Sequence, residues 1–318
     1  KMKKIAFHTN QLGIRGTEVA VYQYAKYNEE ILGNKSVIFT FPNRDMEAYD
    51  KFKERFEVVI LDWCNYEQYL IDNNFDYLYF IKMGNNDGYC LETIPCLIHA
   101  VFRYNYPHGY KYFYVSDWLA KDQGYNPETH SLPHICEKLP QSEYNFREKN
   151  RIPTNATVFG GYGGSTEFNI ESVKNAIREI VKTRDDVYFI FMNFTPFADH
   201  PQIKFFPGNY DLKEKSAFVD ACDAMIHARS GGETFGLAIS EFALSNKPII
   251  TYGLSGENSH LEILKQRSII YNGYEDVLDI FQNLSKYVIY NDYDLPYKQF
   301  SPEIIMDKFN RILLSWKT

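Results

Sequence analysis

Short apolar runs alternate with helical patterns through the first half of the chain. The runs are unbroken rather than alternating with polar residues, as expected of strands that are buried on both faces. Amphipathic spacing between them predicts helices over 17–27 and 44–56. The predicted strands are 4–7, 36–39, 58–61, 77–81, 96–99 and 112–115. This order of elements predicts an α/β domain with a doubly wound parallel sheet.

The same pattern restarts after residues 139–157, a segment with prolines and a charged run that is typical of a linker. The later strands are predicted at 157–159, 187–192, 203–206, 224–227 and 248–252, and the helices at 169–182, 212–221 and 236–246. Ser301-Pro302-Glu303 predicts the start of a last helix that ends near Trp316, because proline is favoured in a first helical turn. The chain of 318 residues is therefore divided into domains at 1–145, joined by the helix at about 302–318, and at 150–300.

Charge and apolar content exclude several classes of protein. The formal net charge is −7, without a basic block, which argues against nucleic-acid binding. The basic run 51–56 contains Glu54 and is better explained as a solvated helix face than as a patch for a membrane surface. The sequence contains no apolar stretch of about 18 residues, so we expect no transmembrane segment and a cytoplasmic protein. The five cysteines lack zinc-ligand spacing, and no metal site is predicted.

Aromatic residues make up 17% of the chain, with 26 Tyr and 24 Phe. Their rings could line a site for a sugar or a base, since they combine a stacking surface with a polar group. Compositional bias is the alternative, because Asn, Lys and Ile are plentiful as well. A Walker A motif is absent, and the glycines at 160–164 do not complete a dinucleotide fingerprint because Thr166 occupies its last position.

The segment 227–241 carries the most chemical information. An apolar strand, a glycine-rich turn and the start of a helix follow one another there, an arrangement that presents free backbone N–H groups to a diphosphate. Glu233 lies in the turn and Glu241 in the helix, where carboxylates can accept hydrogen bonds from sugar or ribose hydroxyls. The alternative for these two residues is a glutamate favoured by the helix dipole and an exposed helical glutamate.

The string GETFGLAISEFALSNKPIITY, which begins at Gly232, resembles the E-x7-E donor motif of retaining GT-B glycosyltransferases, family 4 in particular. Residues 9–18 resemble the glycine-rich loop after the first strand, although Arg15 stands where a glycine is usual. Segments 98–99, 114–119 and 132–135 resemble further parts of the first domain, with His134 in place of the usual asparagine. The resemblance implies a GT-B fold, with two Rossmann-like doubly wound domains facing a central cleft and the last helix returning to the first domain.

The resemblance also implies roles for individual residues. Glu241 would hold the ribose of the nucleotide, and Glu233 and His99 would be catalytic and contact the donor sugar. The remaining residues expected at the sugar and diphosphate are Gly13, Arg15, Gly16, Tyr162, Gly163, Arg229, Thr234, Phe235, Gly236 and Leu237. The family usually has an arginine and a lysine after the first strand of the second domain, and both are missing from 160–168. Arg229 and Arg15 are the candidates to replace them, unless they form ordinary surface or interlobe pairs.

The expected activity is the transfer of a sugar from a UDP- or GDP-sugar to a glycan, lipid-linked or protein-linked acceptor. The resemblance implies a retaining, metal-independent hexosyltransferase that requires no cofactor. Three alternatives remain: a sugar-nucleotide epimerase, a catalytically weak protein that binds sugar nucleotides, and a GT-A transferase that binds a metal through Asp292-Tyr293-Asp294. An acidic turn is the simpler explanation of that last motif, because it comes so late in the chain.

Overall fold

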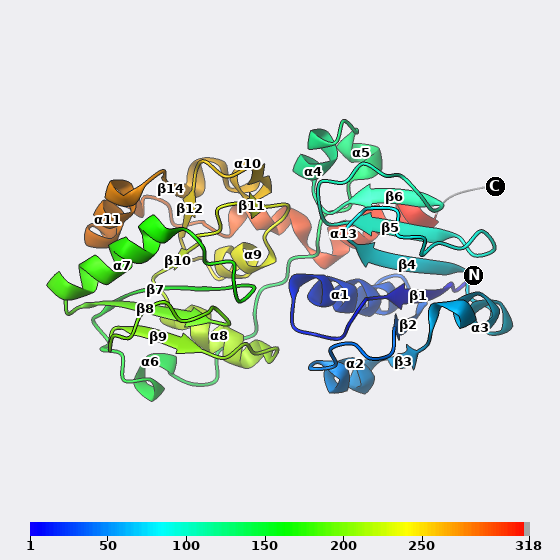
Figure 1. Cartoon of the computed structure of the whole chain (residues 1–318), viewed down its shortest axis with the longest axis horizontal. Helices are drawn as coiled ribbons and strands as arrows, with labels where there is room; N and C mark the ends of the chain where they lie inside the picture. The colour runs from blue at the N-terminus through cyan, green and yellow to red at the C-terminus, as the bar shows by residue number, and fades with distance from the viewer. Residues whose placement is uncertain (315–318) are drawn as a thin grey trace. The chain divides into compact units, whose positions relative to one another are not determined.

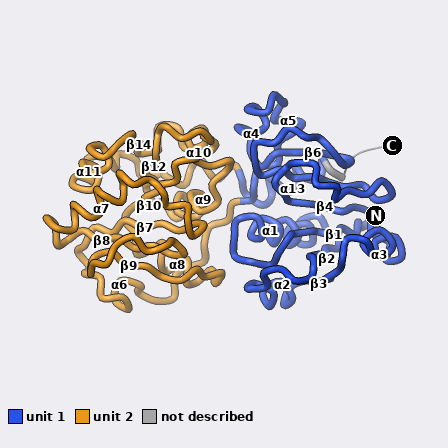
Figure 2. The backbone as a smooth tube through the Cα atoms, in the orientation of Figure 1, with its two compact units in different colours: residues 1–135, 300–318 blue, residues 136–299 orange. Residues whose placement is uncertain are grey.

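The computed structural model describes residues 1–314, which belong to two compact units (Figure 2). Unit 1 contains Lys1–Ile135 and the chain from Phe300 onward, and unit 2 contains Cys136–Gln299. The segment 136–145, which our sequence division places in the first domain, is grouped with unit 2. There, Tyr144 donates a hydrogen bond of 2.6 Å to Glu214. The helix that starts at Pro302 is grouped with unit 1, and its expected end at Trp316 lies outside the described residues.

Unit 1 is built on a parallel sheet of six strands in the order β3-β2-β1-β4-β5-β6 (Figure 1). No helix within residues 1–314 combines the length and the apolar character needed to cross a membrane. The strands are β1 Lys4–His8, β2 Lys35–Thr40, β3 Glu57–Ile60, β4 Tyr77–Lys82, β5 Cys96–Ala100 and β6 Lys111–Tyr114. The helices are α1 Gly16–Glu30, α2 Tyr49–Arg55, α3 Tyr66–Asp72, α4 Asp117–Asp122, α5 Pro127–His130 and α13 Pro302–Phe309.

Unit 2 repeats this architecture with the strand order β14-β12-β10-β7-β8-β9, and all its pairings are parallel. Its strands are β7 Thr157–Tyr162, β8 Val187–Met192, β9 Ile203–Phe206, β10 Ala224–Ile226, β12 Ile249–Tyr252 and β14 Ser268–Tyr271. A separate short ladder joins β11 Gly232–Glu233 to β13 Glu257–Asn258. The helices are α6 Phe146–Lys149, α7 Glu171–Thr183, α8 Leu212–Ala221, α9 Leu237–Leu244, α10 Ser259–Leu264, α11 Tyr274–Gln282 and α12 Leu284–Tyr287.

Both sheets share one topology, and both are parallel and doubly wound, as predicted from the sequence. When the strands of each unit are numbered from its first strand, each sheet reads 3-2-1-4-5-6, the order of dinucleotide-binding domains. In such sheets the connections leave in opposite directions from strands 1 and 4. A crevice therefore opens beyond the carboxyl ends of these two strands, and ligands usually bind there. In unit 2, the two strands are β7 and β10.

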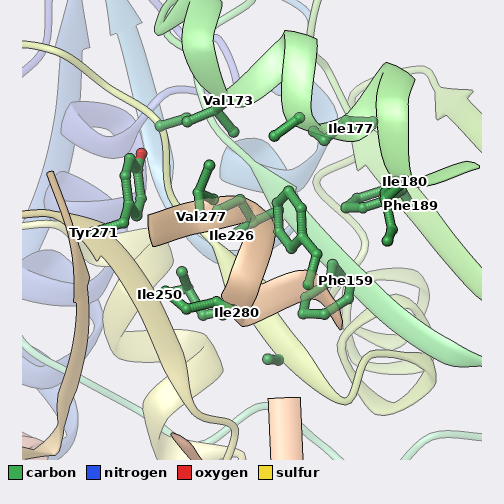
Figure 3. Close-up of a cluster of buried hydrophobic side chains, with 14 of the residues drawn as sticks. Phe159, Val173, Ile177, Ile180, Phe189, Ile226, Ile250, Tyr271, Val277 and Ile280 are labelled. Carbon is green, nitrogen blue, oxygen red and sulfur yellow. The ribbon is translucent and has the colours of Figure 1, made fainter. Parts of the chain in front are cut away.

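The core of unit 2 explains why its strands are apolar without interruption (Figure 3). Helices α7 and α11 pack against each other and bury Val173, Ile177, Val277 and Ile280 in the same cluster as the strand residues. The strand residues of this cluster that Figure 3 labels are Phe159, Phe189, Ile226, Ile250 and Tyr271. Helices on the sheet remove its residues from water, so an alternation of polar and apolar positions is absent.

The core of unit 1 is rich in aromatic rings, and α13 contributes to it. Phe309 of α13 lies 5.6 Å from the ring centre of Tyr24 in α1, and both rings approach Tyr79 of β4. Tyr24 and Tyr79 are almost fully buried. Much of the aromatic content therefore builds cores, which agrees with the compositional explanation rather than with a sugar site.

The helix predicted over 44–56 is shorter than expected, since α2 begins only at Tyr49. Residues 45–48 instead hold the loop that follows β1. The backbone N–H of Leu12 donates to the carbonyl of Asp45 at 2.8 Å, and the N–H of Ala48 donates to the carbonyl of Leu12 at 2.7 Å. Backbone groups that are engaged in these tertiary hydrogen bonds cannot form the first turn of a helix.

Candidate functional site

The segment singled out in the sequence lies at the topological switch point of unit 2. It leaves the carboxyl end of β10, passes through β11 and enters α9, while Tyr162 ends the neighbouring strand β7. Of the predicted residues in unit 2, Glu233, Glu241, Arg229, Tyr162 and Gly236 are therefore all carried by elements that meet at this edge.

Gly232 positions Glu233 through the β11–β13 ladder. Its backbone has a left-handed φ of +82°, and a Cβ atom added there would lie 1.9 Å from the carbonyl oxygen of Glu257. Only glycine allows the two strands to approach this closely. The ladder pairs Gly232 with Glu257 and Glu233 with Asn258, so the direction of the Glu233 side chain is fixed by backbone hydrogen bonding.

Two donors hold the Glu233 carboxylate. His227 Nε2 lies 3.0 Å from its Oε1, and Arg229 donates to its Oε2 at 3.0 Å. Burial raises the pKa of Glu233, but the hydrogen bond from His227 and the charge of Arg229 outweigh burial and bring this pKa to about 2. At neutral pH Glu233 is consequently an anion that accepts hydrogen bonds and has no proton to give.

A buried chain of hydrogen bonds continues behind His227. Its Nδ1 lies 2.9 Å from the Thr251 hydroxyl, which lies 3.0 Å from Nε2 of His260. A carboxylate only accepts, so His227 donates from Nε2, and the Thr251 hydroxyl can then donate to His227 and accept from His260. Nδ1 of His260 has no hydrogen-bond partner among the described residues. Burial lowers the pKa of His260 to about 3, which keeps this ring neutral at pH 7.

The start of α9 provides the backbone donors expected of a diphosphate site. Gly236 is its N-cap with a left-handed φ of 94°, and the helix begins at Leu237 with no side chain capping it. The first N–H groups of a helix lack partners within the helix. Phe235 is buried, and the position of a Cβ on Gly236 would be 3.3 Å from Cγ of Glu233. Thr234 lies between β11 and this turn, so the backbone from Thr234 to Leu237 runs directly beside Glu233.

Glu241 lies one helical turn beyond Leu237 and has its own partners. Lys215, from the first turn of α8, lies 2.9 Å from Oε1 and 2.7 Å from Oε2 of Glu241. The Tyr162 hydroxyl donates to Oε2. Burial, followed by the charge of Glu241, raises the pKa of Tyr162 well above its ordinary value, so the phenol keeps its proton. Glu241 is thus a buried, paired carboxylate rather than the exposed helical glutamate of the alternative explanation.

The loop after β7 contributes an acidic residue. Glu167 accepts from the backbone N–H of Gly164 at 2.9 Å, and its Oε1 lies 3.5 Å from Arg229. The carbonyl of Gly163 accepts from Asn193 at 2.8 Å. Arg229 is therefore paired with two carboxylates, Glu233 and Glu167. Burial lowers the pKa of Arg229, but these two charges outweigh burial and leave it above its ordinary value.

The remaining predicted residues lie in unit 1. Gly13 and Arg15 belong to the loop between β1 and α1, and Gly16 begins α1, at the carboxyl edge of that sheet. Gly13 is buried, and a Cβ added there would lie 2.9 Å from a carboxylate oxygen of Asp45. Arg15 is the exposed N-cap residue of α1, and Gly16 is its first residue.

His99 is embedded in the core of unit 1. The residue is 1% exposed, and its ring nitrogens lie 2.6 Å from the Tyr79 hydroxyl and 2.7 Å from the carbonyl oxygen of Leu132. Burial lowers the pKa of His99 to about 4, so the ring is neutral at pH 7. Both nitrogens are engaged inside the unit. These contacts describe a satisfied core histidine, and contact with a donor sugar remains only a prediction from the resemblance.

Asp292 and Asp294, the basis of the GT-A alternative, are each paired with a cation. Asp292 lies 2.6 Å from Arg267, and Asp294 lies 2.7 Å from Lys298. Within residues 1–314, no group of three or more His, Cys, Asp and Glu side chains is arranged to hold a metal ion. The acidic turn is explained by these two ion pairs.

Sequence reasoning did not assign His227, Thr251, His260 or Lys215 to the site. A signal existed for His227, which ends a predicted strand directly before the glycine-rich turn. Lys215 could not be distinguished from Lys213 in the same helix pattern, although Lys213 is exposed and pairs with Glu143. Thr251 and His260 join the site only through the packing of β12 and α10.

No protein-family model and no curated protein sequence matches this chain. Solved structures do match over nearly its whole length. The structure of HepE from Anabaena in complex with UDP-glucose has a TM-score of 0.76 at 13% identity, with 98% of this chain and 100% of that one covered. Sucrose-phosphate synthase from Thermosynechococcus elongatus has a TM-score of 0.70 at 11% identity, with 98% and 99% covered.

An enzyme of another class has the same overall architecture. A putative UDP-N-acetylglucosamine 2-epimerase from Listeria monocytogenes has a TM-score of 0.63 at 13% identity, with 98% of this chain and 95% of that one covered. At such low identity the similarity establishes the fold and not the activity. The chain has the GT-B fold, with two Rossmann-like domains, and the predicted fold class is confirmed.

Proposed function

We propose that this protein is a glycosyltransferase that moves a sugar from a nucleotide diphosphate sugar to a carbohydrate acceptor. The observation that carries the proposal is the placement of Glu233, the start of α9 and Glu241 in succession at the switch point of unit 2. Such a sequence of groups suits, in order, a sugar, a diphosphate and a ribose. Helix geometry places Glu241 about 6 Å along the axis from Leu237, a separation compatible with phosphate at the helix start and ribose beside Glu241.

The chemistry we propose at Glu233 follows from its permanent charge. Because its pKa is about 2, it has no proton to donate near neutral pH and is only a weak base. It can accept hydrogen bonds from sugar hydroxyls and stabilise positive charge that develops on the sugar as the diphosphate leaves. We propose a retaining transfer without a metal, with the acceptor delivered on the face from which the diphosphate departs. A glycan, a lipid-linked saccharide or a glycosylated protein would serve as acceptor.

A nucleotide panel tests the donor site directly. UDP-sugars come first, because HepE has the same fold and its structure contains UDP-glucose. GDP- and ADP-sugars complete the panel. We expect a shift of several degrees in melting temperature for one nucleotide in the wild type, and loss of this shift in Glu241→Gln. Glu275→Gln, at an exposed position of α11, is the matched control and should keep the shift. A flat panel with folded wild-type protein would rule out the donor site.

The epimerase is the second candidate function because an epimerase shares the fold. Epimerisation requires a base near the sugar, and a carboxylate with a pKa of about 2 is a poor one. Incubation with the donor identified by the panel separates the candidates. A transferase consumes the donor only with an acceptor or slowly by hydrolysis, whereas an epimerase converts it to another sugar nucleotide alone. Binding with neither reaction would identify a sugar-nucleotide binding protein.

A further inference from the structure

Lys215 is a buried cation at the edge of the sheet where the donor is proposed to bind. Its side chain is 12% exposed and reaches from the first turn of α8 to the Glu241 carboxylate, 2.7 Å away. Its ammonium nitrogen also lies 4.8 Å from the centre of the Tyr162 ring. In the unliganded protein the aromatic face and the carboxylate together hold the ammonium group at this position.

The two cations of the site differ in how much negative charge surrounds them. Arg229 faces both Glu233 and Glu167, so its charge is already compensated. Lys215 faces Glu241 together with the neutral phenol of Tyr162. With three carboxylates and two cations in these contacts, a diphosphate would enter a site that already carries an excess of negative charge. Arg229 therefore attracts a diphosphate only weakly, because two carboxylates compensate its charge. Lys215 faces one carboxylate and retains more of its positive charge for the diphosphate.

The backbone donors at the start of α9 do not compensate the excess of negative charge at the site. A helix start contributes roughly half an elementary positive charge, far less than the charge of a diphosphate. The loop that follows β7, from Gly163 to Phe168, contains no basic residue. A cation from another element is therefore needed, and lysine carries its ammonium group on a flexible stem of four carbons.

We propose that Lys215 is the residue of unit 2 that binds the diphosphate of the nucleotide. The inference rests on the proposed function, since it assigns a part of the same donor site. When ribose hydroxyls donate to Glu241, they take lone pairs that Lys215 and Tyr162 occupy in the unliganded protein. The ammonium group then turns from Glu241 toward the phosphate oxygens. Lys215 thus pairs with Glu241 in the unliganded protein and binds the phosphates when the nucleotide is present.

Calorimetry with UDP and uridine tests this role, with GDP and guanosine and with ADP and adenosine as parallel pairs. Lys215→Gln keeps a hydrogen-bond donor toward Glu241 and removes the charge, and Lys215→Arg keeps the charge. Lys213→Met, an exposed lysine on the same helix turn, is the matched control. We expect Lys215→Gln to weaken UDP binding at least tenfold and uridine binding less than twofold, because a charge-assisted hydrogen bond to phosphate is lost. Lys215→Arg and Lys213→Met should stay within threefold of the wild type.

Each other outcome contradicts the inference or the function beneath it. Equal losses of affinity for UDP and for uridine would show that Lys215 only positions Glu241. Unchanged UDP affinity in Lys215→Gln would show that Lys215 does not bind the nucleotide. Lys215→Met serves as a second variant if Lys215→Gln has a lowered melting temperature. If folded wild-type protein binds none of the six compounds, the donor site itself is refuted, which is a different failure from a change at Lys215.

Discussion

Thr251 is the residue on which the buried chain behind Glu233 depends. Its single hydroxyl serves two histidine nitrogens, at 2.9 Å and 3.0 Å, and its side chain is fully buried. Thr251→Val preserves the shape and leaves both nitrogens without a partner, which we expect to lower the free energy of unfolding by at least about 2 kcal/mol. Thr251→Ser keeps the hydroxyl and should lose about 1 kcal/mol or less. Urea denaturation measures both, and equal losses in the two variants would refute the proposed role of the hydroxyl.

At the scale of single residues, the sequence predicted a role for two carboxylates but not the side chains that hold them. Glu233 and Glu241 occur within a recognisable string of glycines and a helix start. Their partners Lys215 and Thr251 come from elements distant in the chain, and nothing in the local sequence marks either residue. His99 shows the opposite case, because its position at a strand end fits the motif while its nitrogens are used inside the core. Spacing along a chain reports backbone placement and cannot report side-chain partners.

At the scale of elements, the β11–β13 ladder depends on the glycine at position 232. Gly232→Ala would place a methyl group against the carbonyl oxygen of Glu257 and impose a left-handed conformation on alanine. We expect a loss of about 2 kcal/mol or more in unfolding free energy, together with loss of nucleotide binding as Glu233 moves. Gly231→Ala is the matched control, since a Cβ there meets no atom within 4 Å. Comparable melting temperatures for the two variants would contradict this account of the ladder.

Elements with a clear local pattern were predictable even when short, as the strand predicted at 203–206 shows, since it has the bounds of β9. The helix predicted at 212–221 has the bounds of α8. The edge strand β14 was missed, and its pattern is weaker because Ile270 is 48% exposed. The ladder of β11 and β13 is shorter still and exists only because Gly232 lets two loops pair. The pairing of these two segments depends on tertiary contacts rather than on local preference.

For the whole molecule, buried histidines predict sensitivity to mild acid. Burial lowers the pKa of His8 and His99 to about 4, that of His260 to about 3, and that of His134 well below its ordinary value. In the unfolded chain these rings bind protons near pH 6.5, so stability is full above that pH and falls as the pH decreases toward the folded pKa values. When the pH falls from 7 to 5, each ring should lower the free energy of unfolding by about 2 kcal/mol.

The measurement is the melting temperature from pH 7.5 to pH 5. Three of the four rings lie in unit 1, so we expect its transition to fall by at least about 10 °C over this range. Glu233 adds nothing in this window, because its pKa of about 2 affects stability only below about pH 4.5. A melting temperature that stays constant between pH 7 and pH 5 would contradict the burial of these rings as neutral groups.

The division of unit 1 into two chain segments affects how the protein can be synthesised. Unit 2 is one continuous stretch, but α13 is translated only after all of unit 2 has been made. Until then, the surface of Tyr24 and Tyr79 that Phe309 covers is without this ring. On the ribosome, the domain begun first is therefore finished last, the reverse of the usual order from the N-terminus. A ribosome that stalls within unit 2 releases a first domain with an open aromatic core, a species prone to aggregate.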